Sequence, residues 1–307
     1  MDLEINSQLY NRKADILAYF RTNAQKSLAG LEKTLKTEDY REKAKALNVL
    51  ITEVKESLIK RITATSESQR WTNVQTLDNV LMITYCSYIV MIEYRNNVWP
   101  YEYMTFSRRI GELWEPFCKL CWEHNKSVTL FEPPLFTAVK KQLSDKINSY
   151  IDNLTLSGVQ KDELKIYYNN VWDLVTSGEV QLGLDLHFEY DSNKFVVDFK
   201  SGFSSNEKGN TNRLLLVGSI YKMLDKRIQC LIFVRSEEDQ NNGYLKLLKK
   251  SGIWEVYCGN QAYDKMREFT KYDIKDWIKT HVAWEKDFDK ETYEYIKKNS
   301  LTDYLIW

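Results

Sequence analysis

The chain has 307 residues, with 43 basic and 43 acidic side chains, and therefore carries no formal net charge at neutral pH. Hydrophobic residues make up 43% of it, and there are only 4 prolines and 11 glycines, which excludes a disordered tail protein, a collagen-like repeat and a flexible linker array. A chain of this length is expected to form about two compact domains.

The sequence predicts a protein that stays in the cytoplasm and does not contact a membrane. The amino-terminal residues include acidic side chains and no apolar core, so we expect no signal peptide. The longest apolar stretch, from Val80 to Ile92, is too short to cross a bilayer core of about 30 Å and is expected to form a buried helix. The 5 scattered cysteines fit free thiols in a reducing compartment.

The first 130 or so residues show helical periodicity. Apolar residues recur at spacings of three and four along one predicted helix, namely Leu47, Leu50, Ile51, Val54, Leu58 and Ile62. Two further helices, from Leu77 to Tyr94 and from Phe106 to Trp122, are expected to cover this face. Because Pro133 and Pro134 break the pattern, we expect a helical domain over residues 1–135 that serves dimer contacts or DNA grip.

Residues 136–307 are expected to form a second, α/β domain. Predicted helices alternate with short apolar strands, which is typical of an α/β layer fold. The expected elements are helices over 161–177, 211–224 and 244–250, strands over 180–190, 194–200, 230–234 and 253–258, and further helix over the last 40 residues.

Charge is unevenly distributed in this second half. Residues 151–199 contain three basic and nine acidic side chains, whereas residues 200–250 contain ten basic and five acidic ones. This pattern would suit a site for divalent cations beside a surface that faces phosphates. The two segments could equally neutralise each other.

Three charged residues lie on what we expect to be a β-hairpin. Asp185 is on its first strand, and Asp198 and Lys200 are on its second. Since side chains alternate along a strand, Asp198 and Lys200 share a face while Phe199 points to the other. A turn over residues 191–194 would bring Asp185 beside Asp198. Two carboxylates on neighbouring strands suit Mg²⁺, and a neighbouring lysine can position a water for phosphodiester hydrolysis.

These residues resemble the PD-(D/E)xK motif of restriction endonucleases and Holliday-junction resolvases. The resemblance implies that Asp185 and Asp198 bind the metal, that the Phe199 carbonyl is a further ligand, and that Lys200 orients or deprotonates the attacking water. Leu184 stands where the family has a proline, which is a departure from the motif. The order helix, strand, strand, helix, strand extends the resemblance from about Glu163 to Val234.

Many family members also carry a glutamate on the preceding helix. Glu163 is the better candidate, since it shares a face with Tyr167 and Asn170 on a helix expected to pack against the sheet. Glu179 is the competitor, but it lies six residues before Asp185, about 20 Å along an extended strand.

The segment after the motif contains candidate DNA contacts. Basic side chains can neutralise phosphates, and asparagines can pair with adenine edges in the major groove. The candidates are Lys208, Asn210, Asn212, Arg213 and Lys222. The same residues could also form an ordinary solvated helix face.

Two other groups could have a chemical role, although a structural one is favoured for both. His187 shares a strand face with Asp185 and could border the site. Cys118, Cys121 and His124 have the spacing of half a zinc site. No second close pair follows them, which favours a place in an aromatic-rich core.

Together these features predict an α/β protein with a restriction-endonuclease-like mixed sheet core flanked by helices and an N-terminal α-helical domain. The expected activity is Mg²⁺-dependent hydrolysis of double-stranded DNA by a homodimer similar to type II restriction endonucleases. One alternative is another nuclease of the same superfamily, such as a junction resolvase or a repair or defence nuclease. The other is a non-catalytic helical interaction protein with a degenerate nuclease fold.

Overall fold

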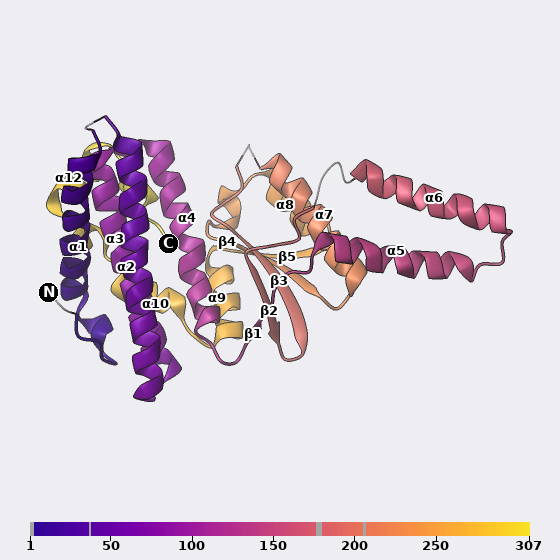
Figure 1. The fold of residues 1–307 in the computed structure, drawn as a ribbon, viewed down its shortest axis with the longest axis horizontal. Helices are drawn as coiled ribbons and strands as arrows, with labels where there is room; N and C mark the ends of the chain where they lie inside the picture. Colours follow the sequence, from indigo (N-terminus) through magenta and orange to yellow (C-terminus); the bar gives the residue numbers. More distant parts are fainter. Residues whose placement is uncertain (1–2, 37, 176–179, 205–206) are drawn as a thin grey trace. The chain divides into compact units, whose positions relative to one another are not determined.

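The computed structural model describes residues 3–36, 38–175, 180–204 and 207–307. Within these ranges the protein has a mixed α/β fold that is mostly helical, with twelve α-helices and one five-stranded sheet (Figure 1). By its internal contacts the chain divides into two units. The helical unit comprises Met1–Ser127 with Tyr263–Trp307, and the sheet unit comprises Val128–Ala262.

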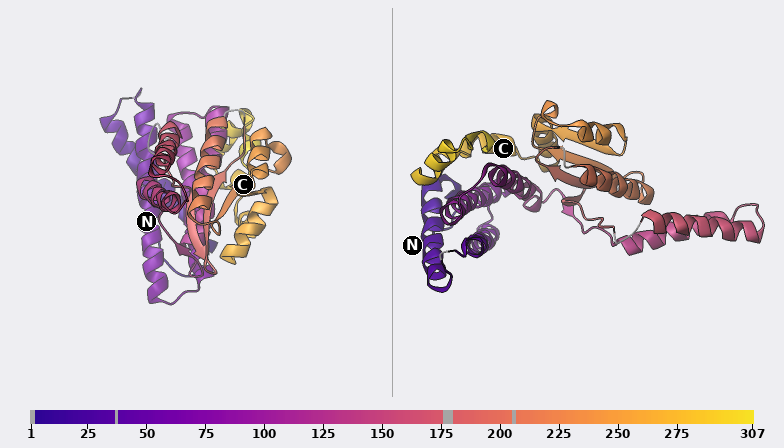
Figure 2. Two further views of the ribbon diagram at one scale, coloured as in Figure 1. Left: turned by 90° about the vertical axis from the view of Figure 1, so that its right-hand side faces the viewer. Right: turned by 90° about the horizontal axis from the view of Figure 1, so that it is seen from above.

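The helical unit is built around α3, which packs against α1, α2 and α4 (Figures 1 and 2). The expected apolar face of α2 is confirmed, since Leu47, Ile51, Leu58 and Ile62 are buried. The helix α3 is buried along most of its length, as expected for the stretch from Val80 to Ile92. The helices of this unit are α1 (Lys13–Thr34), α2 (Tyr40–Ser68), α3 (Asn73–Val98), α4 (Tyr103–Glu123), α10 (Ile274–His281), α11 (Trp284–Asp287) and α12 (Lys290–Lys298).

Buried polar contacts connect the C-terminal segment to α1 and α3. Glu93 of α3 is fully buried, and its carboxylate accepts hydrogen bonds from Arg21 of α1 at 2.6 and 2.9 Å. The backbone N–H of Asp289 donates to the same carboxylate at 2.7 Å, and Arg21 also donates to the Asp287 carbonyl at 2.7 Å. Burial raises the pKa of Glu93, and the hydrogen bond from Arg21 opposes that rise. These contacts hold the end of the chain in the helical unit.

The sheet has the strand order β1-β2-β3-β4-β5. The β1–β2 and β2–β3 pairs are antiparallel, whereas the β3–β4 and β4–β5 pairs are parallel. One face packs against α5, α7 and α8. The strands are β1 (Thr129–Leu130), β2 (Leu186–Tyr190), β3 (Asn193–Lys200), β4 (Gln229–Val234) and β5 (Trp254–Cys258). The remaining helices are α5 (Phe136–Asp152), α6 (Gly158–Val175), α7 (Lys208–Leu224), α8 (Gly243–Lys250) and α9 (Gly259–Thr270), of which α9 runs from the sheet unit into the helical unit.

A tight turn fixes the register of the β2–β3 hairpin. Asp191 and Ser192 both have positive φ angles, of 48° and 61°, as required at the two central positions of a type I′ turn. Asp and Ser are short polar residues, and Asp tolerates this left-handed region better than most. The resulting register pairs Leu186 with Val197. This pair is the last of the hairpin ladder, and Asp185 and Asp198 are the residues that come directly next to it on the two segments.

The structure differs from the expected organisation in two respects. The expected domains were residues 1–135 and 136–307, whereas the structure divides the chain after Ser127 and returns Tyr263–Trp307 to the helical unit. The strand expected from Val180 begins only at Leu186, so that Asp185 lies in a bend just before β2 and not on the strand itself.

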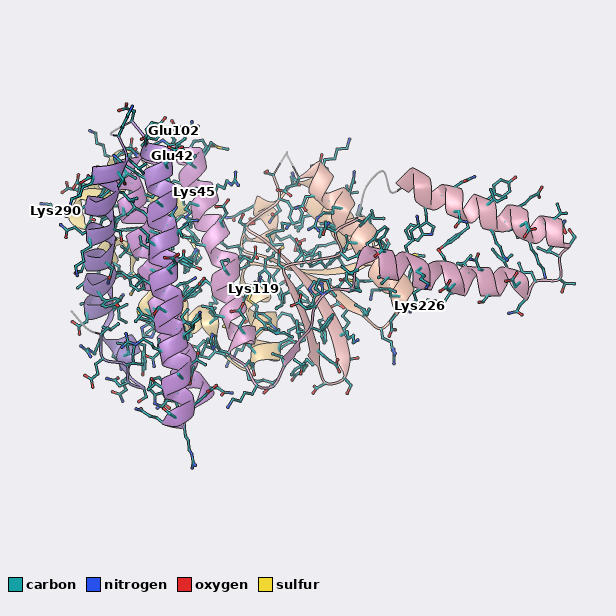
Figure 3. The ribbon with its side chains drawn as sticks, in the orientation of Figure 1. Glu42, Lys45, Glu102, Lys119, Lys226 and Lys290 are labelled. Carbon is teal, nitrogen blue, oxygen red and sulfur yellow. The ribbon has the colours of Figure 1, made fainter. Side chains whose placement is uncertain are left out.

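We predict that Glu93→Ala lowers the free energy of unfolding by about 3 kcal/mol, because it leaves the Arg21 guanidinium without its carboxylate in a largely buried site. Thermal unfolding followed by calorimetry measures the effect. Glu42→Ala is the control, since Glu42 is exposed on α2 (labelled in Figure 3) and its loss should cost less than about 0.5 kcal/mol. Equal effects of the two substitutions would contradict this role for Glu93.

Candidate functional site

Asp198 and Lys200 lie at the carboxyl end of β3, on the same face of the strand. Asp198 is fully buried, and its carboxylate forms an ion pair with the Lys200 ammonium, whose side chain is 16% exposed. Phe199 points to the opposite face and packs against Phe233 of β4 at 5.4 Å between ring centroids. Strand alternation therefore gives the arrangement expected for these three residues.

Asp185 is held against the same end of β3. Its Oδ2 accepts a hydrogen bond of 2.6 Å from the backbone N–H of Phe199. This bond fixes the carboxylate beside the strand on which Asp198 lies. The two acidic groups are close enough for the charge of Asp185 to raise the pKa of Asp198.

Burial is the main cause that raises the pKa of Asp198, to about 6. The Lys200 ammonium opposes this rise, the charge of Asp185 adds to it, and Arg213 opposes it more weakly. The Asp198 Oδ2 atom lies directly against the Lys200 ammonium, and Oδ1 accepts a long hydrogen bond from Arg213. These two cations compensate the buried carboxylate, so a divalent cation would have to share Asp198 with them.

Arg213 of α7 joins the cluster, which the sequence did not indicate. Its Nη2 donates to Asp198 Oδ1 at 3.3 Å, and its Nη1 donates to the Gly183 carbonyl at 3.4 Å. These are long hydrogen bonds, and the side chain is 38% exposed. The sequence predicts Arg213 only as a DNA contact. One feature of the sequence could have indicated the position of Arg213. The helix α7 connects the parallel strands β3 and β4, so that its first turns follow closely on the end of β3.

The oxygen atoms at this end of β3 are of the kind that hard divalent cations bind. They are the carboxylates of Asp185 and Asp198 and the carbonyl of Phe199, which accepts a hydrogen bond of 3.1 Å from Lys200 Nζ. Mg²⁺ commonly takes one or two carboxylates and completes its shell with waters and phosphate oxygens. No group of three or more His, Cys, Asp or Glu side chains suited to a metal occurs among the described residues. A metal here would therefore depend on two carboxylates and the backbone carbonyl.

The structure does not bring Glu163 to this cluster. Glu163 is exposed on α6, and Tyr167 on the same face is 63% exposed. The helix packs through the opposite face instead, where Tyr168 and Trp172 contact the core. The expectation that the Glu163 face covers the sheet is therefore wrong. The competing candidate, Glu179, lies outside the described residues.

The predicted DNA contacts on α7 separate into two groups. Lys208 and Asn212 are exposed near its amino-terminal end, where Asn210 donates to Glu207 at 2.9 Å. Lys222 lies near the other end of the helix and donates to the Ile228 carbonyl at 2.5 Å, which fixes the connection to β4. Lys222 therefore has a structural contact away from Asp198.

The histidine and cysteine candidates lie in packed surroundings. The His187 Nε2 atom is 3.0 Å from the Tyr221 hydroxyl, which donates to the Leu182 carbonyl at 3.0 Å. Cys118 and Cys121 are buried in α4, and burial raises the pKa of both thiols. Because metals bind the thiolate form, this environment favours the core interpretation of the two cysteines.

Comparison with known proteins adds no family assignment. No protein-family model matches the sequence, and neither the curated proteins nor the solved structures include a significant match. None of the helices in the described part of the chain is both long enough and apolar enough to span a bilayer.

The raised pKa of Asp198 predicts a specific pH dependence of stability in metal-free solution. A carboxyl group with a higher pKa in the folded state stabilises the fold fully below its unfolded value of 3.8, and this contribution is lost as the pH rises through about 6. Asp198→Asn cannot titrate. From about pH 4 to about pH 8, the wild type should therefore lose about 2 kcal/mol of stability relative to the variant. Denaturant unfolding with EDTA measures this difference, and parallel pH profiles would contradict it.

Proposed function

We propose that the protein is a Mg²⁺-dependent endonuclease that hydrolyses phosphodiester bonds in double-stranded DNA. The observation that carries this proposal is the convergence of the buried Asp198, its strand neighbour Lys200 and the anchored Asp185 at one end of β3. This is the combination of two carboxylates and one lysine that the PD-(D/E)xK resemblance implies.

Each of these residues has a role that its position supports. Asp185 and Asp198, with the Phe199 carbonyl, would hold the metal ion. When bound, Mg²⁺ supplies Lewis-acid activation of a water and stabilises the charge that develops on the phosphate. Lys200, which already contacts both Asp198 and the Phe199 carbonyl, would hold the attacking water in line.

Arg213 would contribute a positive charge to the same site. In the described structure its guanidinium is shared between Asp198 and the Gly183 carbonyl through long hydrogen bonds. A cation bound at the carboxylates would satisfy Asp198, leaving the partly exposed Arg213 free to contact a phosphate oxygen. Lys208 and Asn212, exposed on the preceding turns of α7, could extend this contact along the DNA backbone.

The order of elements around the cluster supports a restriction-endonuclease-like core. The chain runs from α6 through the antiparallel pair β2 and β3, then through α7 to the parallel strand β4. The resemblance implies this same order. Among the superfamily's activities we favour a type II restriction enzyme, for which cutting both strands of a palindrome would require a homodimer.

One observation favours a second function. Asp198 already has two cationic neighbours, Lys200 and Arg213, so the cluster could serve only to neutralise a buried charge. The replacement of the family's proline by Leu184 is consistent with such a degenerate site. The protein would then be a non-catalytic interaction protein.

The nuclease proposal predicts that purified protein with Mg²⁺ cuts unmethylated phage DNA. Asp198→Ala and Lys200→Ala should each lower the cleavage rate by about a hundredfold or more, because each removes a group that acts on the reacting water or its metal. Gel electrophoresis of the products measures the rate. Glu189→Gln on β2 and Lys226→Ala, an exposed lysine labelled in Figure 3, are matched controls that should cut like the wild type.

The pattern of products separates the remaining possibilities. Discrete bands with one shared end sequence would support a restriction enzyme, whereas a smear or junction-specific cutting would support another nuclease of the superfamily. If Asp198→Ala or Lys200→Ala cut at the wild-type rate, the site assignment would be wrong. No cleavage by any folded protein would favour the non-catalytic alternative.

A further inference from the structure

The helical unit has a basic cavity of its own, between α2, the end of α3 and α4. Its volume is about 630 Å³, which is within the range of small-molecule sites. Four basic and two acidic side chains contribute to its wall. The charged residues are Arg41, Lys45, Arg95, Arg109, Glu53 and Glu56.

Arg95 is a buried charged residue in the wall of this cavity that has no acidic partner in the described structure. Its side chain is held between two aromatic rings, with the guanidinium carbon 4.1 Å from the centre of Trp99 and 4.3 Å from the centre of Tyr101. The residue is only 8% exposed, and its Nη1 atom is buried without a hydrogen-bond partner among the described residues. Buried arginines are normally paired with acids, because the loss of hydration is otherwise uncompensated.

A second guanidinium reinforces the positive charge. Arg109 also has a buried nitrogen, Nε, without a hydrogen-bond partner among the described residues, and its Nη2 contacts the Met91 sulfur at 3.4 Å. Burial lowers the pKa of Arg95, and the charge of Arg109 lowers it further. Neither arginine forms an ion pair with Glu53 or Glu56 in the described structure. Both guanidinium groups therefore contribute positive charge to the wall of the same cavity.

The geometry favours an anion with several oxygen atoms. The contacts with Trp99 and Tyr101 hold the Arg95 guanidinium in place. A guanidinium presents its N–H groups in one plane, which suits bidentate binding of phosphate. Arg41, 5.4 Å from the centre of Trp99, adds a charge at the exposed side of the cavity. One buried arginine, one partly buried arginine and two further basic residues match a doubly charged group better than a singly charged carboxylate.

We infer that this cavity binds a terminal phosphate group, carried by a free mononucleotide or by the end of a nucleic acid strand. The inference concerns the helical unit alone and stands whether or not the sheet unit is a nuclease. The two carriers share the same phosphate chemistry and differ only in what extends from it.

The test is calorimetric titration of the full chain at constant ionic strength set with chloride. The probes are inorganic phosphate, adenosine monophosphate, and a short oligonucleotide with either a terminal phosphate or a terminal hydroxyl. Saturable binding of the monophosphate alone would identify a free nucleotide, and binding of the phosphorylated oligonucleotide alone would identify a strand end. Binding of both would assign the phosphate group itself, and all three results support the inference.

Three variants locate the site. Arg95→Met should weaken binding by about tenfold or more, and Arg41→Ala should weaken it by a smaller factor. Arg108→Met is the matched control, since Arg108 precedes Arg109 but is 81% exposed and pairs with Glu112. Arg95→Met should still fold, because Arg95 is not paired with an acid in the described structure. Its thermal unfolding transition in phosphate-free buffer tests this. If Arg95→Met does not fold, the binding affinity of Arg41→Ala is the deciding measurement.

Three results would overturn the inference. One is that the wild type binds no probe, and another is that folded Arg95→Met, or Arg41→Ala in its place, binds as tightly as the wild type. The third is that the two oligonucleotides bind equally while adenosine monophosphate does not, since that pattern reports general backbone attraction.

Discussion

The complete burial of one charged residue, Asp198, is the constraint on which the sheet unit depends. A carboxylate removed from water must be compensated, and here the compensation comes from Lys200 two residues along β3 and from Arg213 on α7. The helix that follows β3 is thereby connected to the strand by charge as well as by apolar packing. Apolar residues of similar volume would often stabilise such a position at least as well. Folding alone therefore does not require a charged cluster at this position.

Much of this cluster could be predicted from the sequence because the interactions that create it are local. Strand alternation places Asp198 and Lys200 on one face, and a two-residue turn at Asp191 and Ser192 sets the hairpin register, which ends with Leu186 and Val197 next to the two aspartates. The overall α/β class follows from similar local patterns. The position of Arg213 cannot be predicted from local patterns, since it depends on which face of α7 packs on the sheet.

Two other features could not be predicted from local patterns. The C-terminal segment returns to the helical unit through contacts between Arg21, Glu93 and the backbone of residues 287 and 289, which are almost 200 residues from α3 in sequence. On α6, the sequence does not show which face packs against the core, because both faces contain large apolar side chains. Trp172 is buried, whereas Ile166 and Tyr167 are 57% and 63% exposed, so that periodicity alone assigned Glu163 to the wrong side.

The central claim is that Asp185 and Asp198 together hold a divalent cation, and direct metal binding tests it independently of any DNA substrate. Titration of the metal-free protein with Mn²⁺, followed by electron paramagnetic resonance, measures free and bound ion. The account predicts saturable binding that Asp185→Asn abolishes and Glu189→Gln leaves intact. Equal binding by all three proteins, or no binding by the wild type, would contradict it.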